Sequence, residues 1–256
     1  KTVIEKTWVN LHDGWGILNG QRMGNGKSLS TMATLDGLAV LGEPFHAVLL
    51  HPKSMTTAWI NEFEMWEHLL HYAFFQFQAN DDKSLRVWKA KGGLLALTHD
   101  AFKSKKVDLE LQEDHIIIVD EAGSYKKRKT ELHESIASSA ARRRILLTGT
   151  PVQNNLTEMY WLLQLVKPGC FGEPETFVKQ YDEPIRAGQA RDASDSAKAL
   201  CKARTFSFQK IASVYWDDCS ALERLLKPKR EYKVVQAVDP AFLKDMASTT
   251  PKDDVT

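Results

Sequence analysis

The stretch Ile116-Ile117-Ile118-Val119-Asp120-Glu121-Ala122-Gly123 decides the fold, because a short run of β-branched residues ends in two adjacent carboxylates. Such a run predicts a strand that is buried on both faces at the centre of a parallel sheet. Asp120 and Glu121 would then stand at the carboxyl end of this strand, where open α/β sheets bind their ligands. Two acids at such a position require a cation.

A glycine-rich turn near the start of the chain would bring that cation together with a phosphate ligand. The turn follows an apolar run at residues 15–18 and opens a helical pattern, which is the setting of a phosphate-binding loop. Gly24 and Gly26 would let backbone N–H groups turn inward onto phosphate oxygens. Lys27 would place a positive charge on the β- and γ-phosphates, and the Ser28 hydroxyl would ligate Mg²⁺. With the acidic pair, the turn predicts one nucleoside triphosphate site.

The two motifs divide the chemistry of this predicted site between them. Asp120 would hold the same Mg²⁺ through water, and Glu121 would orient and deprotonate the attacking water. The predicted nucleotide-contacting residues are Gln21, Met23, Gly24, Asn25, Gly26, Lys27 and Ser28. The general pattern asks for glycine six residues before the lysine, where this chain has Gln21, so the turn taken alone could be an ordinary glycine-rich turn. The acidic pair argues against that alternative.

Composition narrows the class of protein. The chain of 256 residues is 43% hydrophobic, which suffices for one large α/β domain with or without an appendage. Its formal charge of +1 excludes a polybasic nucleic-acid binder, so any such binding must come from local patches. Cys170, Cys201 and Cys219 are far apart, form no C-x-x-C pair and fit reduced thiols inside a cell.

The chain lacks the features of a membrane or secreted protein. No apolar run reaches 18 residues, and the sequence begins with Lys1 without a signal-like region. We therefore expect no association with a membrane, and we expect the sequence to be a piece of a longer chain.

Strand and helix patterns alternate along the first part of the chain. Helical periodicity covers residues 29–41. It returns at Trp59, Phe63 and Trp66, which we interpret as core positions rather than a base-stacking platform. Further apolar runs predict strands at residues 47–50, 74–77, 94–97 and 145–147. The repeated β-then-α order, with right-handed crossovers, predicts an α/β fold with a doubly wound parallel sheet.

The pattern changes after Pro168-Gly169. Residues 173–227 are polar and helix-prone and lack strand signals, so we expect a helical appendage. β character returns at residues 231–238, and residues 247–256 have the composition of a linker or a frayed end. The predicted domains are residues 1–166, 167–228 and 229–256. Residues 1–14 are polar, and their pattern assigns them no role.

Four ordered stretches make the sequence similar to the first motor lobe of the Swi/Snf-type ATPases of helicase superfamily two. They are Met23-Gly24-Asn25-Gly26-Lys27-Ser28, then Pro52-Lys53-Ser54 with Trp59 and residues 62–66, then Asp120-Glu121-Ala122, and last residues 146–156, which contain Thr148-Gly149-Thr150-Pro151. The resemblance covers residues 15–240 and is closest to the ATRX-like and Rad54-like branch. It implies a RecA-like P-loop NTPase lobe, a helical protrusion after the last stretch, and a return strand and linker toward a second lobe.

The resemblance implies that the chain binds ATP with Mg²⁺ and takes part in ATP-driven translocation on double-stranded DNA. Such a motor would remodel nucleosomes or displace DNA-bound proteins, a second RecA-like lobe of the same parent chain would be its partner, and the nucleus would be its location. In the parent superfamily, nucleic acid crosses the sheet edge reached by the second and last stretches. The implied DNA-contacting residues are Pro52, Lys53, Ser54, Thr98 and His99, and the implied coupling residues are Thr148, Gly149 and Thr150.

Simple structural roles remain open for several of these residues. Lys53 and Ser54 would start a helix whose N–H groups, with one cation, could grip a phosphate without reading sequence. His99 could equally be an ordinary polar residue at the end of a strand. Three basic runs are interpreted as solvated faces, and they occupy residues 103–106, 126–129 and 142–144.

Two departures from the family pattern leave a second function open. Gly123 stands where the family usually has a histidine, so a hydrogen bond across to the last stretch would be lost and the coupling of hydrolysis to movement would loosen. Nothing in the sequence resembles the second lobe, whose arginine finger is worth about 10³–10⁵ in turnover, so the isolated lobe should be nearly inactive. The alternative is a degenerate lobe that serves as a DNA- or protein-binding scaffold. A P-loop kinase or metabolic NTPase is disfavoured, because the last stretch has no place in it.

Overall fold

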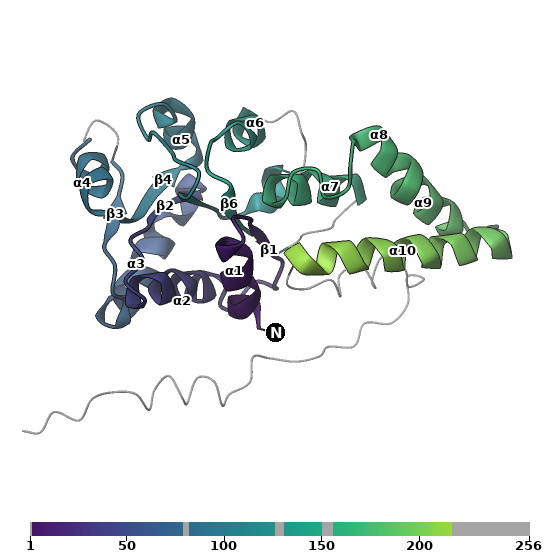
Figure 1. Ribbon diagram of the computed structural model, residues 1–256, viewed down its shortest axis with the longest axis horizontal. Helices are drawn as coiled ribbons and strands as arrows, with labels where there is room; N and C mark the ends of the chain where they lie inside the picture. Colours follow the sequence, from purple (N-terminus) through teal and green to yellow (C-terminus); the bar gives the residue numbers. More distant parts are fainter. Residues whose placement is uncertain (1, 79–81, 126–130, 150–155, 217–256) are drawn as a thin grey trace, which may run out of the picture. The chain divides into compact units, whose positions relative to one another are not determined.

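A parallel sheet of six strands forms the centre of the computed structural model (Figure 1). The structure describes residues 2–78, 82–125, 131–149 and 156–216. The strands are β1 (Ile17–Asn19), β2 (His46–His51), β3 (Phe74–Gln76), β4 (Gly93–Thr98), β5 (Ile116–Val119) and β6 (Arg143–Leu147). They lie in the order β1-β6-β5-β2-β4-β3, and every neighbouring pair is parallel. The predicted parallel sheet is therefore confirmed.

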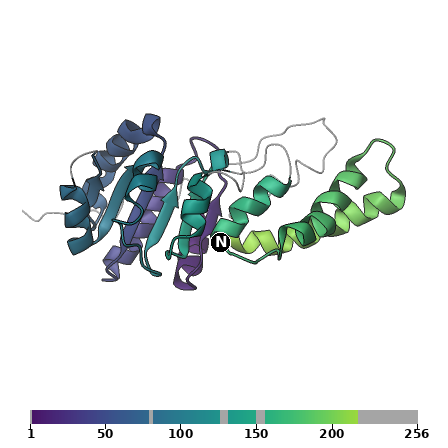
Figure 2. The same cartoon turned by 90° about the horizontal axis from the view of Figure 1, so that it is seen from above.

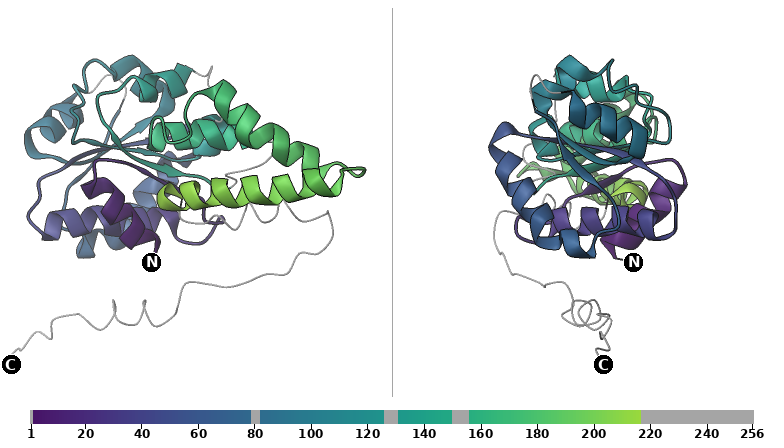
Figure 3. Two further views of the ribbon diagram at one scale, coloured as in Figure 1. Left: turned by 45° about the vertical axis from the view of Figure 1, so that its right-hand side comes forward. Right: turned by 90° about the vertical axis from the view of Figure 1, so that its left-hand side faces the viewer.

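Helices cover both faces of the sheet, as Figures 1 and 3 show. One layer consists of α1 (Val3–His12), α2 (Lys27–Val40) and α3 (Thr56–Trp66). The other consists of α4 (Lys83–Lys91), α5 (His99–Lys105), α6 (Glu131–Ala137) and α7 (Leu156–Val166). Short turns of 3₁₀-helix are η1 (Lys53–Met55), η2 (Glu67–Leu69) and η3 (Ala122–Tyr125). The sheet is thus doubly wound, as its β-then-α order predicts.

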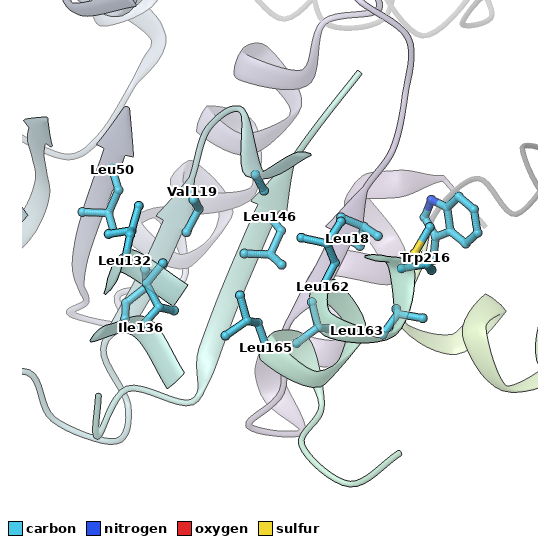
Figure 4. Close-up of a cluster of buried hydrophobic side chains, with 14 of the residues drawn as sticks. Leu18, Leu50, Val119, Leu132, Ile136, Leu146, Leu162, Leu163, Leu165 and Trp216 are labelled. Carbon is cyan, nitrogen blue, oxygen red and sulfur yellow. The ribbon is translucent and has the colours of Figure 1, made fainter. Parts of the chain in front are cut away.

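The central strand β5 explains how one apolar run serves both layers. Ile116 and Ile118 pack into the cluster formed with α1, α2 and α3, whereas Ile117 and Val119 pack into the cluster on the opposite face. Successive side chains of a strand point to opposite faces, so a strand covered on both sides is apolar throughout. Figure 4 shows the second cluster, in which Val119 lies among leucines of β2, β6, α6 and α7 and Ile136 of α6.

The first helix forms where the sequence pattern assigns no element. Thr2 and Glu5 make a reciprocal capping box, in which the Thr2 hydroxyl accepts from the Glu5 N–H and the Glu5 carboxylate accepts from the Thr2 N–H. Leu11 is buried in the cluster shared with α2 and α3. Asn10 donates from Nδ2 to the Val214 carbonyl at 3.0 Å, which joins α1 to the last described helix.

The helical appendage follows α7 and is confirmed as far as residue 216. It consists of α8 (Pro174–Phe177), a π-helical turn η4 (Val178–Asp182), α9 (Glu183–Gln189) and α10 (Asp195–Tyr215). Figure 2 shows α9 and α10 running side by side. Gly188 permits this approach, because a Cβ at that position would collide with the Cβ of Cys201. Of the predicted segments, residues 217–228 and the return strand and linker at 229–256 lie outside the described residues, and the two boundaries between the three predicted domains stay predictions.

Aromatic side chains hold the appendage to the end of α7. The rings of Phe171 and Phe208 stack with centroids 4.8 Å apart, and those of Tyr160 and Phe177 lie 4.6 Å apart. At Trp216 the chain forms a parallel bridge with Leu18 of β1, so it returns to the sheet after α10. None of the helices in the described ranges is long and apolar enough to span a bilayer.

Candidate nucleotide and nucleic-acid site

Three neighbouring strands bring the predicted nucleotide residues to one edge of the sheet. β1 leads into the glycine turn, β5 ends just before Asp120, and β6 lies between them and ends just before Thr148. Because these strands are parallel, their carboxyl ends meet at the same edge. β1 and β5 are two strand spacings apart, about 10 Å, a gap that a phosphate chain and its metal ion can bridge.

The glycine turn is open and has the backbone conformation that glycine favours. Gly24 has φ +80° and Gly26 has φ +72°, and a Cβ at either position would meet nothing within 4 Å. Glycine is therefore needed there for its conformation and not for space. Gly26 caps α2 without a side chain, so the first N–H groups of the helix are directed toward the turn. Asn25 and Met23 are exposed in the same turn.

Lys27 is the first residue of α2, and its ammonium lies within the turn. Nζ donates to the carbonyl oxygens of Gln21 at 3.0 Å and Arg22 at 3.2 Å. These two bonds place the positive charge at the mouth of the turn, beside the N terminus of α2. Ser28, the next residue, is half-buried in the first turn of that helix.

The acidic side of the site is buried and fixed by hydrogen bonds. Asp120 is only 8% exposed. Its Oδ2 accepts from the Trp59 indole Nε1 at 2.8 Å, and its Oδ1 accepts from the Glu121 backbone N–H at 2.9 Å. The Asp120 N–H continues the ladder to β2 by donating to the Leu50 carbonyl at 2.8 Å. The carboxylate is thus held in one orientation from both sides.

Glu121 has an unusual backbone conformation for a residue with a side chain. Its φ is +51°, in the left-handed region, and its side chain is half-buried. Such a conformation costs a non-glycine residue about 1–2 kcal/mol and is concentrated at functional sites. The turn ends the strand and sends the chain directly into η3, which contains Gly123.

The strand between the two motifs touches the glycine turn. A Cβ on Gly149 would lie 2.9 Å from Met23 Cγ and 3.9 Å from Lys27 Nζ. Thr148 is fully buried, and its N–H donates to the Asn19 carbonyl at 3.0 Å, so this residue joins β6 to the base of the turn. Of the predicted coupling residues, Thr150 lies outside the described residues.

The donor set fits Mg²⁺ carried by a nucleotide rather than a metal held by protein alone. In the described ranges, no group of three or more His, Cys, Asp or Glu could hold a metal ion. Mg²⁺ prefers hard oxygen ligands and is commonly held by one or two protein groups plus phosphates. The Asp120 carboxylate and the Ser28 hydroxyl are such groups, and the open glycine turn leaves room for phosphate.

The predicted DNA-contacting residues lie at the ends of β2 and β4, on the same edge of the sheet. Lys53 and Ser54 are exposed in η1, which leads directly into α3, and Pro52 caps that turn. Thr98 pairs with the last residue of β2, and its hydroxyl accepts from the Ala101 N–H at 3.2 Å as the N-cap of α5. The Thr98 side chain therefore has a structural role at the start of a helix.

His99 faces inward and would be neutral at neutral pH. Burial and, to a smaller extent, the neighbouring His51 lower its pKa to about 4, and hydrogen bonds to the backbone of Leu50 and Asp120 and the charge of Asp100 oppose the shift. A neutral ring cannot form an ion pair with phosphate. If His99 contacts DNA, it does so by a hydrogen bond.

Sequence reasoning missed two polar groups that adjoin the acidic pair. Trp59 is buried, as predicted, but its indole N–H reaches Asp120. Since a buried indole N–H normally finds an acceptor, the tryptophan itself was a signal. His51 is fully buried at the end of β2, burial lowers its pKa, and its Nδ1 lies 3.0 Å from the Pro52 carbonyl oxygen.

The basic runs differ in how far their side chains are exposed to solvent. Lys103 pairs with Asp100 and Glu131, and Lys105 pairs with Asp82 and Asp108, and all four carboxylates are exposed on a solvated face. The interpretation as a solvated face is wrong for Arg144, which is 4% exposed. Its guanidinium donates to the carbonyls of Ala137, Ser139, Ala141 and Leu165, and burial lowers its pKa to about 10. The run at residues 126–129 lies outside the described residues.

Comparison with known proteins identifies the family. The model of the SNF2-related domain matches residues 8–214 of the chain. The chain belongs to the SNF2-related domain family. One relative, the transcriptional regulator ATRX homolog of Drosophila melanogaster, is 27% identical over 250 residues, which cover 86% of this chain and 19% of the relative. Another, the DNA excision repair protein ERCC-6-like of Danio rerio, is 31% identical over 194 residues, which cover 72% of this chain and 13% of the relative.

A solved SNF2 structure has the same fold. The Sulfolobus solfataricus SWI2/SNF2 ATPase core in complex with dsDNA matches with a TM-score of 0.66 at 20% identity, over 83% of this chain and 42% of that chain. The family match and this shared fold together confirm the predicted resemblance to the first lobe of a Swi/Snf ATPase, with its RecA-like fold. This SNF2-related chain spans less than half of the solved core and less than a fifth of the two relatives.

Proposed function

We propose that the chain is the first motor lobe of an ATP-dependent double-stranded-DNA translocase that remodels chromatin, and that it binds Mg-ATP and part of the DNA backbone. The observation that carries this proposal is the meeting of the glycine turn and the Asp120–Glu121 pair at one sheet edge, with Gly149 between them. Family membership supports ATPase chemistry. The names of the relatives, a transcriptional regulator and a DNA excision repair protein, support a nuclear DNA-directed role.

Each side of the site has a distinct task in this proposal. The N terminus of α2 and the Lys27 ammonium bind and orient the phosphates. Bound Mg²⁺ would neutralise charge on the phosphates, held by Asp120 and Ser28. Glu121 accepts a proton from the attacking water, and it directly follows Asp120, whose carboxylate accepts the Glu121 backbone N–H.

The DNA contact is proposed for the neighbouring strand ends. Lys53 and Ser54 lie exposed in η1, which leads into α3, and a cation at the start of a helical segment favours a phosphate oxygen. The solved Sulfolobus core was obtained in complex with dsDNA, and this supports duplex DNA as the ligand. Nucleosomes, DNA-bound proteins and a second RecA-like lobe of the parent chain are the proposed partners. Without that lobe, turnover should be low.

A fluorescent-ATP titration of the 256-residue chain tests the proposal. The Lys27→Ala variant should weaken nucleotide binding by at least about tenfold, because a charge-assisted contact to phosphate is worth about 1.5–3 kcal/mol. The matched control is Lys91→Ala, which removes an exposed lysine at the end of α4 and should leave the affinity unchanged. Equal affinities in the two variants would refute the assignment of the phosphate site.

Gly123 supports one second candidate, a degenerate lobe that acts as a DNA- or protein-binding scaffold without ATP turnover. Glycine provides no side chain that could hydrogen-bond across to Thr148 or Gly149. The same titration distinguishes the two candidates when it is repeated with duplex DNA. DNA binding by the wild-type chain with no measurable nucleotide binding would favour the scaffold.

A further inference from the structure

We propose that Trp59 is a positioning residue that holds the Asp120 carboxylate for Mg²⁺ and connects it to the DNA-contacting end of α3. This inference rests on the proposed function and goes beyond it, because it assigns the link between the two ligands to one hydrogen bond. The bond runs from Trp59 Nε1 to Asp120 Oδ2 and measures 2.8 Å.

The hydrogen bond is well placed to control the carboxylate. Trp59 is 2% exposed and Asp120 is 8% exposed, so water cannot readily replace the indole N–H. A buried carboxylate that loses a donor keeps the cost of its desolvation, which makes hydrogen bonds to charged groups strong. The other oxygen, Oδ1, accepts from the Glu121 N–H. Together the two donors fix which lone pairs remain for the metal and its water.

The same helix carries the proposed DNA contact. Lys53 and Ser54 lie in η1, which runs without a break into α3, and Trp59 is the fourth residue of that helix. From Lys53 to Trp59 is six residues, or about 9 Å along a helix axis. A helical segment this short moves as one body. A phosphate that binds at its N terminus therefore fixes the position of the indole N–H, and with it the Asp120 carboxylate.

The packing of α3 allows one substitution to separate the ring from its N–H. Trp59 lies in the buried cluster with Leu49 of β2 and Leu94 of β4. The Trp59→Phe variant keeps an aromatic ring in this cluster and removes the donor. Trp88→Phe is the matched control: Trp88 is fully buried, and its Nε1 donates to the Gly93 carbonyl at 3.0 Å, with no contact to Asp120.

The test measures Mg²⁺ titrations of fluorescent-ATP binding by the 256-residue chain, with and without a duplex DNA of random sequence. In the wild-type chain, DNA should lower the Mg²⁺ concentration at half-saturation, because two linked ligands affect each other reciprocally. Trp59→Phe should raise this midpoint about tenfold and make it insensitive to DNA, while the DNA affinity measured without nucleotide and Mg²⁺ stays unchanged. Trp88→Phe should keep both the wild-type midpoint and its response to DNA.

The outcomes separate this inference from the proposed function. If Trp59→Phe keeps the wild-type midpoint and response to DNA, Trp59 is only a core residue and the inference is overturned, while the nucleotide site stands. If the wild-type chain binds no nucleotide, both fail together. If Trp59→Phe does not fold, benzothienylalanine at position 59 replaces it, since this analogue keeps the bicyclic shape and exchanges the N–H for sulfur. A wild-type response from the analogue would equally overturn the inference.

Discussion

On one side of the candidate nucleotide site, the glycine turn is exposed, and the Lys27 ammonium donates to carbonyl groups of the same turn. On the other side, Asp120 is buried, and each of its carboxylate oxygens accepts a hydrogen bond from a different partner. The turn has glycines in left-handed conformations with open space around them, whereas the acidic side has a glutamate in that conformation beside a packed core.

This difference indicates which side of the site becomes ordered only when its ligand binds. An open turn of low packing density can adjust its N–H groups to a phosphate when it arrives, and the entropic cost of ordering is then paid on binding. A carboxylate fixed before binding needs no such adjustment and acts through electrostatic preorganisation. We therefore expect substitutions on the turn to change affinity, and substitutions on the acidic side to change turnover, metal response and stability.

The largest effect expected from this comparison is on turnover. In the two-lobe parent chain, Glu121→Gln should lower DNA-stimulated ATP hydrolysis by about 10²–10⁴, because the amide cannot accept the proton of the attacking water. Nucleotide affinity should stay within about threefold of wild type, since the charge that binds phosphate lies on the other side of the site. Steady-state hydrolysis and a fluorescent-ATP titration measure the two quantities.

The control for this prediction is Glu175→Gln, which alters an exposed carboxylate of α8 in the helical appendage and should retain hydrolysis. Should Glu121→Gln hydrolyse ATP at the wild-type rate, the base assignment would be wrong. Should it instead lose affinity, the acidic side would contribute to binding and the contrast between the two sides would weaken.

The sequence allowed the two motifs to be found because each depends on local rules. A β-branched run between turns predicts β5, and Gly24 and Gly26 before a helical pattern predict the phosphate turn. The parallel order of strands then follows from short right-handed connections, and it brings both motifs to one edge. The strand order and the regular spacing of neighbouring strands then fix the distance between the two motifs.

The parts that the sequence did not reveal depend on contacts between distant residues. Arg144 belongs to a run of three arginines, yet its position in β6 faces the buried cluster and the carbonyl ends of α6 and α7. Trp59 was assigned to the core without an acceptor for its N–H, because Asp120 is 61 residues away. Thr2 and Glu5 have the spacing of a capping box, but the helix that follows is only weakly apolar, so the sequence pattern did not predict α1.

A smaller effect should appear in the pH dependence of stability. His99 has a pKa of about 4 in the folded chain and a reference pKa of 6.5. Between these two pH values the unfolded chain therefore binds a proton that the folded chain does not bind. Stability is therefore lost as pH falls through 6.5 toward 4, and the loss ends below that range. Between pH 7.5 and pH 5 the loss due to His99 should be about 1–2 kcal/mol, which His99→Gln should remove.

Urea unfolding at the two pH values measures this prediction. The His68→Gln variant, which alters an exposed histidine of η2, is the control and should keep the wild-type pH dependence. If His99→Gln kept the wild-type pH dependence, protonation of His99 would not destabilise the folded chain. The tightly packed surroundings of Asp120 would then not extend to the end of β4.

The smallest effect should come from a methyl group placed between the two sides. In Gly149→Ala, the new Cβ would lie 2.9 Å from Met23 Cγ, and Met23 is 75% exposed, so its side chain can move aside. Stability should change by less than about 0.5 kcal/mol, as for a surface substitution, and nucleotide affinity should fall by about threefold because the Met23 side chain that moves aside belongs to the phosphate turn. Thermal unfolding and the fluorescent-ATP titration measure the two effects.

Gly16→Ala is the opposite case. Its Cβ would collide with the backbone carbonyl of Arg144, which cannot move aside, so this substitution should destabilise the fold strongly. If Gly149→Ala proves as destabilising as Gly16→Ala, the turn is held as rigidly as the acidic side, and the nucleotide would meet a site that is preformed throughout.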